Sequence, residues 1–343
     1  MLSRRELALA AGAAVAGAAV GGAMLWRGRN PGTLQPFDPE LRPFVERFLD
    51  HPPPDLTSAS LAAFRAMETA SAPSPLPGPA VTRTVVAGLN GAPPVGVHLI
   101  NARAQGARPA ILYVHGGGFV MGNAAGAVRQ LQGLAAALDC VAVAVDYRLA
   151  PEVRHDAMLD DCNAVLRWVH DQAAGIGVDP SRIAIMGASA GGGLAALLAM
   201  RARDENVVRP CFQLLVYPML DNRTGTTAGA KPPCPTLLWS EANNRFGWNA
   251  FLGPTGDAGA VPGRRTDLAG LPPTLIAVGS VDLFLGEDVA FATELAQARV
   301  PVALKIIPGA FHGFDLAVPQ SRAAARLRAD IEAALGKVFA DRD

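Results

Sequence analysis

The sequence is poor in cysteine, and its histidines are not grouped. Four cysteines, at positions 140, 162, 211 and 234, are scattered over 343 residues, and no two of them form a C-x-x-C pair. This spacing excludes a disulfide scaffold and a cysteine-ligated metal site. The six histidines show no H-E-x-x-H pattern and no cluster, so we expect no catalytic metal.

Net charge is absent as well, because 30 Lys and Arg residues balance 30 Asp and Glu residues. A nucleic-acid partner is therefore not expected, since binding to phosphates requires a basic surface. Only 17% of the residues are charged and 50% are hydrophobic. This composition excludes intrinsic disorder and provides for a large core. The length is that of one large domain or two ordinary ones.

The first thirty residues form a separate segment. Arg4 and Arg5 precede a run of mostly Ala, Gly, Val and Leu at 7–25 that carries no charge. A basic start before an apolar stretch resembles an export signal of the twin-arginine type, which predicts a periplasmic or extracellular protein. Two alternatives stay open: the segment is retained as a membrane anchor, or the start is mis-assigned and the protein is cytoplasmic. We expect membrane contact only through this segment.

Residues 31–79 differ in pattern from the rest of the chain. Helical patterns at 39–49 and 58–70 are separated by prolines, and the Pro-rich run 73–79 marks a domain boundary. Beyond it, short β-branched runs alternate with longer helical ones, and several runs are continuously apolar, as in strands buried on both faces of a parallel sheet. Strands are predicted at 81–86, 95–100, 110–114, 141–145, 182–186, 212–216, 275–278 and 302–307. Helices are predicted near 124–138, 156–171, 190–203, 287–299 and 320–338.

This alternation predicts an α/β fold with a mostly parallel central sheet and helices on both faces. Residues 221–265 interrupt the alternation and carry Trp239, Phe246, Trp248 and Phe251 among Pro, Gly and Asn. We interpret them as an insertion in a domain that spans 80–343. Together with the helices of 31–79, the insertion is expected to form a helical cap.

Ser189 lies in the sequence Gly187-Ala188-Ser189-Ala190-Gly191, between a predicted strand and a predicted helix. At a sharp strand-to-helix turn a serine projects its hydroxyl above the sheet, and flanking glycines remove β-carbons that would clash. The N-terminus of the following helix directs backbone N–H groups toward developing negative charge. The pattern indicates a nucleophile, with a glycine-rich turn before a core helix as the alternative.

The second glycine-rich loop is His115-Gly116-Gly117-Gly118, which follows another apolar strand. Three glycines suit a loop whose backbone approaches a ligand closely and exposes its N–H groups. The N–H groups of Gly116, Gly117 and Ala190 could form an oxyanion hole for acyl transfer. A phosphate-binding loop is the alternative, but the Lys and Ser/Thr of a P-loop are missing. We assign His115 to anchoring the loop.

These stretches resemble the hormone-sensitive-lipase-like branch of the α/β-hydrolases, a family of carboxylesterases. The resemblance covers the chain from about residue 81 to its end, and it implies the α/β-hydrolase fold, no cofactor, and a chain order of Ser, then Asp or Glu, then His. It also implies a scaffolding role for the loop 146–152, in which we expect Asp146 and Arg148 to pair. The matching stretches are 115–119, 146–152, 187–192, 217–218 and 311–314.

The resemblance identifies His312, in the sequence FHGF, as the general base. Asp282 follows a predicted strand, at the strand end where this fold presents its site, and we predict that it orients His312. Glu287 and Asp288 are the rival acids, but they begin a helix, where negative charge interacts favourably with the helix dipole. Family members often carry another acid shortly after the triad aspartate, where this chain has Leu-Gly before Glu287.

We therefore predict a serine carboxylesterase that hydrolyses short- to medium-chain acyl esters through a Ser189–His312–Asp282 triad and an acyl-enzyme. Its expected partner is a small-molecule ester. An amidase, a lactonase or a sugar deacetylase would use the same triad. A third hypothesis is a non-catalytic ligand-binding protein on the same fold.

Overall fold

The computed structural model describes residues 31–227, 235–254 and 256–340. The predicted export segment at 1–30 lies outside these residues. In the part of the chain that the structure describes, no helix combines the length and the apolar character needed to cross a bilayer.

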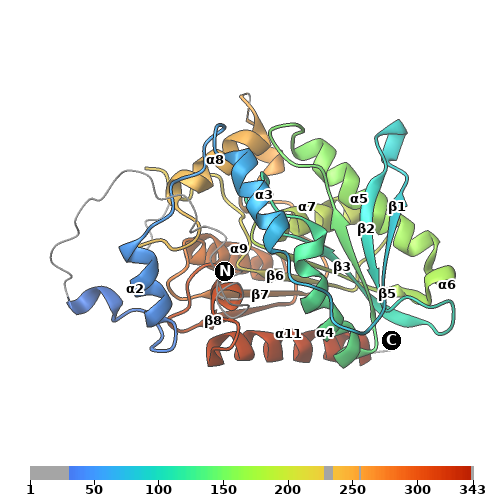
Figure 1. The fold of residues 1–343 in the computed structure, drawn as a ribbon. Helices are drawn as coiled ribbons and strands as arrows, with labels where there is room; N and C mark the ends of the chain where they lie inside the picture. The colour runs from blue at the N-terminus through green and yellow to red at the C-terminus, as the bar shows by residue number, and fades with distance from the viewer. Residues whose placement is uncertain (1–30, 228–234, 255, 341–343) are drawn as a thin grey trace.

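An eight-stranded sheet forms the centre of the molecule, in the order β1-β2-β4-β3-β5-β6-β7-β8 (Figure 1). The pairs β1–β2 and β2–β4 are antiparallel, and all later pairs are parallel. The predicted fold class is thus confirmed, and each predicted strand is present. The strands are β1 (Val81–Val86), β2 (Val95–Ile100), β3 (Arg108–Val114), β4 (Val141–Asp146), β5 (Val178–Ala188), β6 (Phe212–Val216), β7 (Thr274–Gly279) and β8 (Val302–Ile307).

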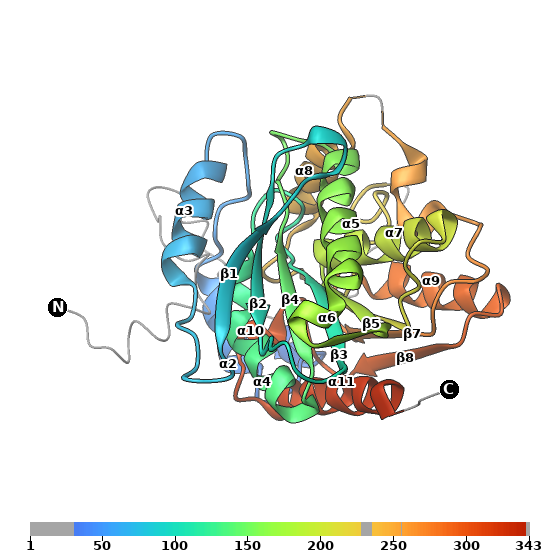
Figure 2. The ribbon, with the colours of Figure 1, turned by 90° about the vertical axis from the view of Figure 1, so that its right-hand side faces the viewer.

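Helices cover both faces of the sheet, as the alternating pattern predicts (Figure 2). One buried cluster includes residues of α5, α7 and α9, and the other includes residues of α4 and α11 on the opposite face. The helices after β3 are α4 (Val128–Leu138), α5 (His155–Asp171), α6 (Ala173–Ile176), α7 (Ala190–Glu205), α8 (Glu241–Leu252), α9 (Leu285–Gln297), α10 (Phe314–Ala317) and α11 (Arg322–Ala340).

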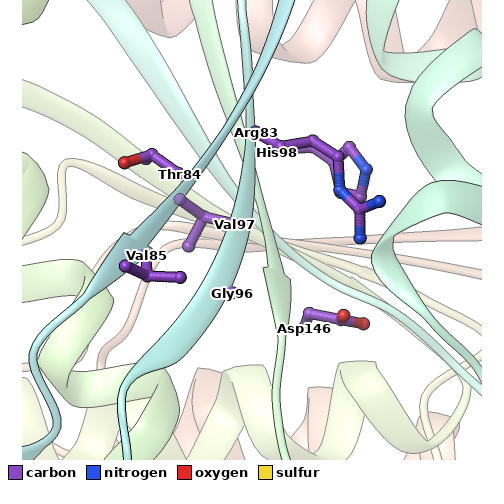
Figure 3. Close-up of a pocket in the computed structure, with 7 residues that line it drawn as sticks. All are labelled: Arg83, Thr84, Val85, Gly96, Val97, His98 and Asp146. Atoms are coloured by element: carbon purple, nitrogen blue, oxygen red, sulfur yellow. The ribbon is translucent and has the colours of Figure 1, made fainter.

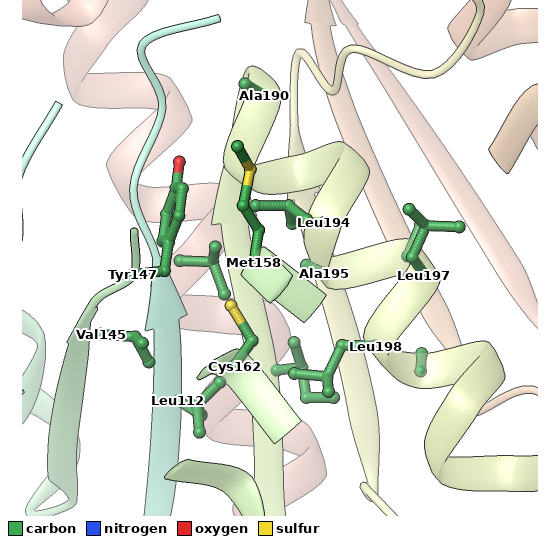
Figure 4. Packing of buried hydrophobic residues seen from close by; sticks show 14 of the residues in the cluster. Leu112, Val145, Tyr147, Met158, Cys162, Ala190, Leu194, Ala195, Leu197 and Leu198 are labelled. Atoms are coloured by element: carbon green, nitrogen blue, oxygen red, sulfur yellow. The ribbon is translucent and has the colours of Figure 1, made fainter. Parts of the chain in front are cut away.

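Buried hydrophobic side chains of α5, α7 and the neighbouring strands pack together close to Ala190, the residue after Ser189 (Figure 4). Cys162 of α5 and Leu194 and Leu198 of α7 are fully buried against Leu112 of β3 and Val145 of β4. Interiors of this kind are close-packed and resist local displacement. The turn between β5 and α7, which carries Ser189, therefore stands on a rigid base.

Two further helices precede the sheet, α2 (Arg42–Asp50) and α3 (Leu61–Ser71). Hydrogen bonds join the connection between them to the insertion that contains α8. The N–H of Leu56 donates to Asn243 Oδ1 at 2.7 Å, and Ser240 Oγ donates to Asp55 Oδ1 at 2.5 Å. The N-terminal segment and the insertion are thus in direct contact.

Candidate active site

Ser189 occupies the turn between β5 and α7, with φ 54° and ψ −124°. A non-glycine residue with positive φ is strained, and such strain persists only where the surroundings enforce it. Here the N–H of Ser189 donates to Val216 O at 2.9 Å, and its carbonyl accepts from Met219 N at 2.9 Å. A Cβ at Gly187 would overlap the carbonyl of Gly191, so the turn needs glycine at that position.

The structure brings together the three residues that the sequence predicts as a triad. Ser189 Oγ lies 3.0 Å from His312 Nε2. His312 Nδ1 lies 3.1 Å and 3.2 Å from the two carboxylate oxygens of Asp282. The three residues are buried, and they follow β5, β7 and β8 at one edge of the sheet. The distances permit a proton to pass from the hydroxyl to the imidazole while the carboxylate orients the ring.

The two rival acids do not contact His312 through a hydrogen bond. Glu287 Oε1 accepts the N–H of Leu220 at 2.6 Å, and burial raises the pKa of Glu287 to about 8. Asp288 is fully buried, and neither of its carboxylate oxygens has a hydrogen-bond partner among the described residues. Burial raises the pKa of Asp288 well above its ordinary value, because a charge cannot be solvated there. Glu287 is therefore mostly protonated at neutral pH, and burial favours the neutral form of Asp288 as well.

Aromatic rings fix the position of His312. The rings of Tyr217 and Phe284 meet the imidazole edge-on, with centroids 4.7 Å and 4.9 Å away. The Tyr217 hydroxyl donates to Asp315 Oδ1 at 2.9 Å. The sequence marks Tyr217 only as part of a family stretch, and nothing in it singles out Phe284 or Asp315, since each has the appearance of an ordinary core or helix residue.

The loop of Gly116 and Gly117 lies against the nucleophile turn. A Cβ at Gly116 would come within 2.9 Å of Ala188 O and 3.2 Å of Ser189 Cβ, so only glycine allows this approach. Gly117 has φ 115°, a conformation that favours glycine. Ala190 is the first residue of α7 and is fully buried. The three predicted oxyanion donors therefore belong to two adjoining turns beside Ser189.

His115 contacts the backbone of this loop and the ring of Tyr147. Its Nδ1 lies 2.8 Å from Gly116 O, and its ring stacks on Tyr147 with centroids 4.2 Å apart. The Tyr147 hydroxyl donates to His115 O at 2.8 Å. Burial lowers the pKa of His115, so the ring is neutral. These contacts agree with an anchoring role.

One expected contact in the loop 146–152 is wrong. Arg148 does not pair with Asp146; it binds Asp161 of α5 through Nε at 2.8 Å and Nη2 at 2.7 Å. Asp146 instead accepts the N–H of Ala124 at 3.1 Å. The buried carboxylate of Asp161 requires a charged partner, and Arg148 provides one with bidentate geometry.

The insertion contacts the site at two points. Its Trp239 ring packs so closely on Gly118 that a Cβ there would overlap it, and the indole Nε1 donates to Asn244 Oδ1 at 3.3 Å. Leu238 Cδ1 would come within 3.3 Å of a Cβ at Gly313, next to His312. The insertion thus places two apolar side chains, Trp239 and Leu238, against the site. Trp239 contacts the glycine loop 115–122, which we call the oxyanion loop, and Leu238 lies next to the residue after His312.

A hollow of about 450 Å³ lies elsewhere, over the antiparallel end of the sheet (Figure 3). It contains none of the triad residues or oxyanion donors. The residues that line the hollow are Arg83, Thr84, Val85, Gly96, Val97, His98 and Asp146.

Within the described ranges, no group of three or more His, Cys, Asp and Glu side chains could hold a metal ion.

Comparison with known proteins gives concordant results. The family described as "alpha/beta hydrolase fold" matches residues 111–316. Esterase LipI of Mycobacterium tuberculosis is 38% identical over 216 residues, which cover 61% of this chain and 67% of that protein. Carboxylesterase NlhH of the same species is 37% identical over 224 residues, or 62% of this chain and 69% of that protein. The solved structure "Bacterial Heroin Esterase" superposes with a TM-score of 0.80 at 33% identity, covering 90% of this chain and 99% of that one.

Proposed function

The chain belongs to the α/β-hydrolase-fold family, in its hormone-sensitive-lipase-like branch, and on this premise we propose that it is a serine carboxylesterase. The observation that carries the proposal is the unbroken contact from Ser189 Oγ through His312 to Asp282, beside the glycine loop. Its relatives are named as esterases, which supports a carboxylic ester as the substrate.

The geometry supports the following role for each residue. His312 Nε2 removes the proton of Ser189, whose oxygen attacks the ester carbonyl, while Asp282 holds the imidazole in the required tautomer. The N–H groups of Gly116, Gly117 and Ala190 stabilise the oxyanion. His312 then protonates the leaving alcohol, and an acyl-enzyme remains. Water, activated by the same histidine, hydrolyses it and restores the serine. No step requires a cofactor.

The surroundings of the triad support an uncharged substrate. Trp239 and Leu238 bring apolar surface to the oxyanion loop and the histidine. An apolar wall favours acyl groups and excludes charged ones, since a buried charge without a partner is costly. Because Trp239 packs directly on Gly118, we propose acyl groups of short to medium length. The basic and apolar sequence of residues 1–30 supports export of the enzyme.

A panel of p-nitrophenyl esters tests this function. We expect acetyl, butyryl and hexanoyl esters to be hydrolysed faster than the palmitoyl ester, and His312→Ala to lower kcat by about 10⁴-fold or more on all of them. The matching aryl amide, p-nitroacetanilide, should react more slowly than p-nitrophenyl acetate. A faster reaction with the amide would contradict the proposal and identify an amidase.

A further inference from the structure

The oxyanion loop is bound on its outer side by a helix that lies far from it in the sequence. Glu68 of α3 accepts the backbone N–H of Gly122 through Oε2 at 2.7 Å. One turn earlier on α3, Arg65 Nε donates to the carbonyl of Val120 at 2.7 Å. Residues three positions apart share one face of a helix. One face of α3 therefore binds both a donor and an acceptor of the loop's backbone.

Gly122 transmits this contact to the residues beside the nucleophile. It has φ 101°, and a Cβ at this position would overlap both Gly116 O and His115 Nδ1. The end of the loop is thus packed directly on the backbone of Gly116 and the ring of His115 at its beginning. A shift of Gly122 would displace the peptide that joins Gly116 to Gly117, and the N–H of Gly117 is one of the proposed oxyanion donors.

Arg65 has further acceptors in the loop 146–152. Its Nη2 donates to Ala150 O at 2.7 Å, and its guanidinium binds both carboxylate oxygens of Glu152 at 2.7 Å and 2.9 Å. Arg65 thereby links the oxyanion loop to the loop 146–152. The Glu152 side chain is 61% exposed, so its ion pair with Arg65 is expected to contribute little.

The Glu68 side chain is half-buried where α3 meets the loop. Burial raises its pKa, while the hydrogen bond from Gly122 and the charge of Arg65 act in the opposite direction. Burying a carboxyl group is unfavourable unless hydrogen bonds compensate. The contact with Gly122 supplies that compensation, and it is available only when the loop has its observed shape.

We propose that Glu68 and Arg65 are positioning residues that hold the oxyanion loop in its catalytic geometry from outside the α/β domain. The proposal rests on the proposed esterase function. Neither side chain contacts the triad, so both act through the backbone of Gly122 and Val120. Their loss should weaken binding of the transition state, in which the oxyanion forms, more than binding of the substrate.

The test compares Glu68→Ala and Glu68→Gln with the control Glu152→Gln on p-nitrophenyl butyrate. We expect Glu68→Ala to lower kcat by about 10- to 100-fold, because small displacements of catalytic donors have effects of this size, with KM changed less than about threefold. Glu68→Gln should keep kcat within about threefold of wild type, since its amide oxygen accepts the same N–H. Glu152→Gln should behave as wild type.

A second measurement separates positioning from simple loss of stability. The affinity of Glu68→Ala for a trifluoromethyl ketone, which forms an oxyanion on Ser189, should fall in parallel with kcat, while its affinity for the neutral amide butyramide, which forms no oxyanion, stays unchanged. If Glu68→Ala does not fold, Arg65→Lys replaces it, because a lysine cannot reach Val120 and Ala150 together. If wild type is active and Glu68→Ala has the same kcat, this inference is overturned and the proposed function stands. An inactive wild type would instead overturn the proposed function.

Discussion

The nucleophile turn and the oxyanion loop adjoin each other but are held in different ways. The turn at Ser189 is fixed from within the sheet, by backbone hydrogen bonds to Val216 and Met219. The loop is fixed in addition by side chains of α3, more than fifty residues earlier in the chain. A strained turn inside a close-packed core needs no outside support, whereas a loop with three positive-φ glycines does.

Glu287 and Glu68 each accept a backbone N–H near the site, and they differ in where they lie. Glu287 accepts the N–H of Leu220, just after the strand that supports the turn, and it is buried. Glu68 accepts the N–H of Gly122 from α3, a helix that precedes the sheet in the chain, with Arg65 on the same helix face. Glu287 is a buried, mostly neutral acid, whereas Glu68 is partly exposed and lies near the cation of Arg65.

The largest effect is expected from a change that breaks the turn. In Gly191→Ala the new methyl group would overlap the carbonyl oxygens of Val114 and His115, both backbone atoms that cannot move aside. We expect the free energy of unfolding to fall by about 3 kcal/mol or more. The control is Gly133→Ala, at an exposed position inside α4 with open space around it. It should stabilise the protein by about 0.5–1 kcal/mol. Equal stabilities of the two variants in urea unfolding would contradict this view of the turn.

An effect of another kind, which depends on pH, should come from Glu287. Folding raises the pKa of Glu287 from 4.5 to about 8, so above about pH 4.5 the unfolded chain loses this proton while the folded protein keeps it. The stability of wild type should therefore decline as the pH rises from about 4.5 to 8. Glu287→Gln cannot titrate and should lose less stability over this range. Urea unfolding at several pH values measures the difference, and parallel profiles would rule out a protonated Glu287.

Much of this arrangement can be predicted from the sequence, because it is encoded locally. Continuous apolar runs predict the strands, although β5 begins at Val178 rather than at 182, since polar residues at its start hide it. The two glycine motifs predict where backbone must approach backbone. The family resemblance, with its order of motifs, implies which distant histidine and aspartate meet Ser189.

Contacts between distant side chains could not be predicted in the same way. Glu68 on an amphipathic helix has the pattern of a solvated residue, and its role appears only when α3 lies on the oxyanion loop. Several acidic residues lie near Arg148 along the chain, and only the packing of α5 shows that its partner is Asp161 rather than Asp146. Ion pairs of this kind depend on tertiary structure rather than on spacing.

The most direct test of the central claim is labelling with a p-nitrophenyl phosphonate, followed by intact-mass measurement and peptide mapping. The account predicts that wild type gains one phosphonyl group, that the group maps to Ser189, and that Ser189→Ala gains none. It also predicts much slower labelling of His312→Ala, because the hydroxyl then lacks its base. Stoichiometric labelling that persists in Ser189→Ala would show that the nucleophile lies elsewhere and would contradict the account.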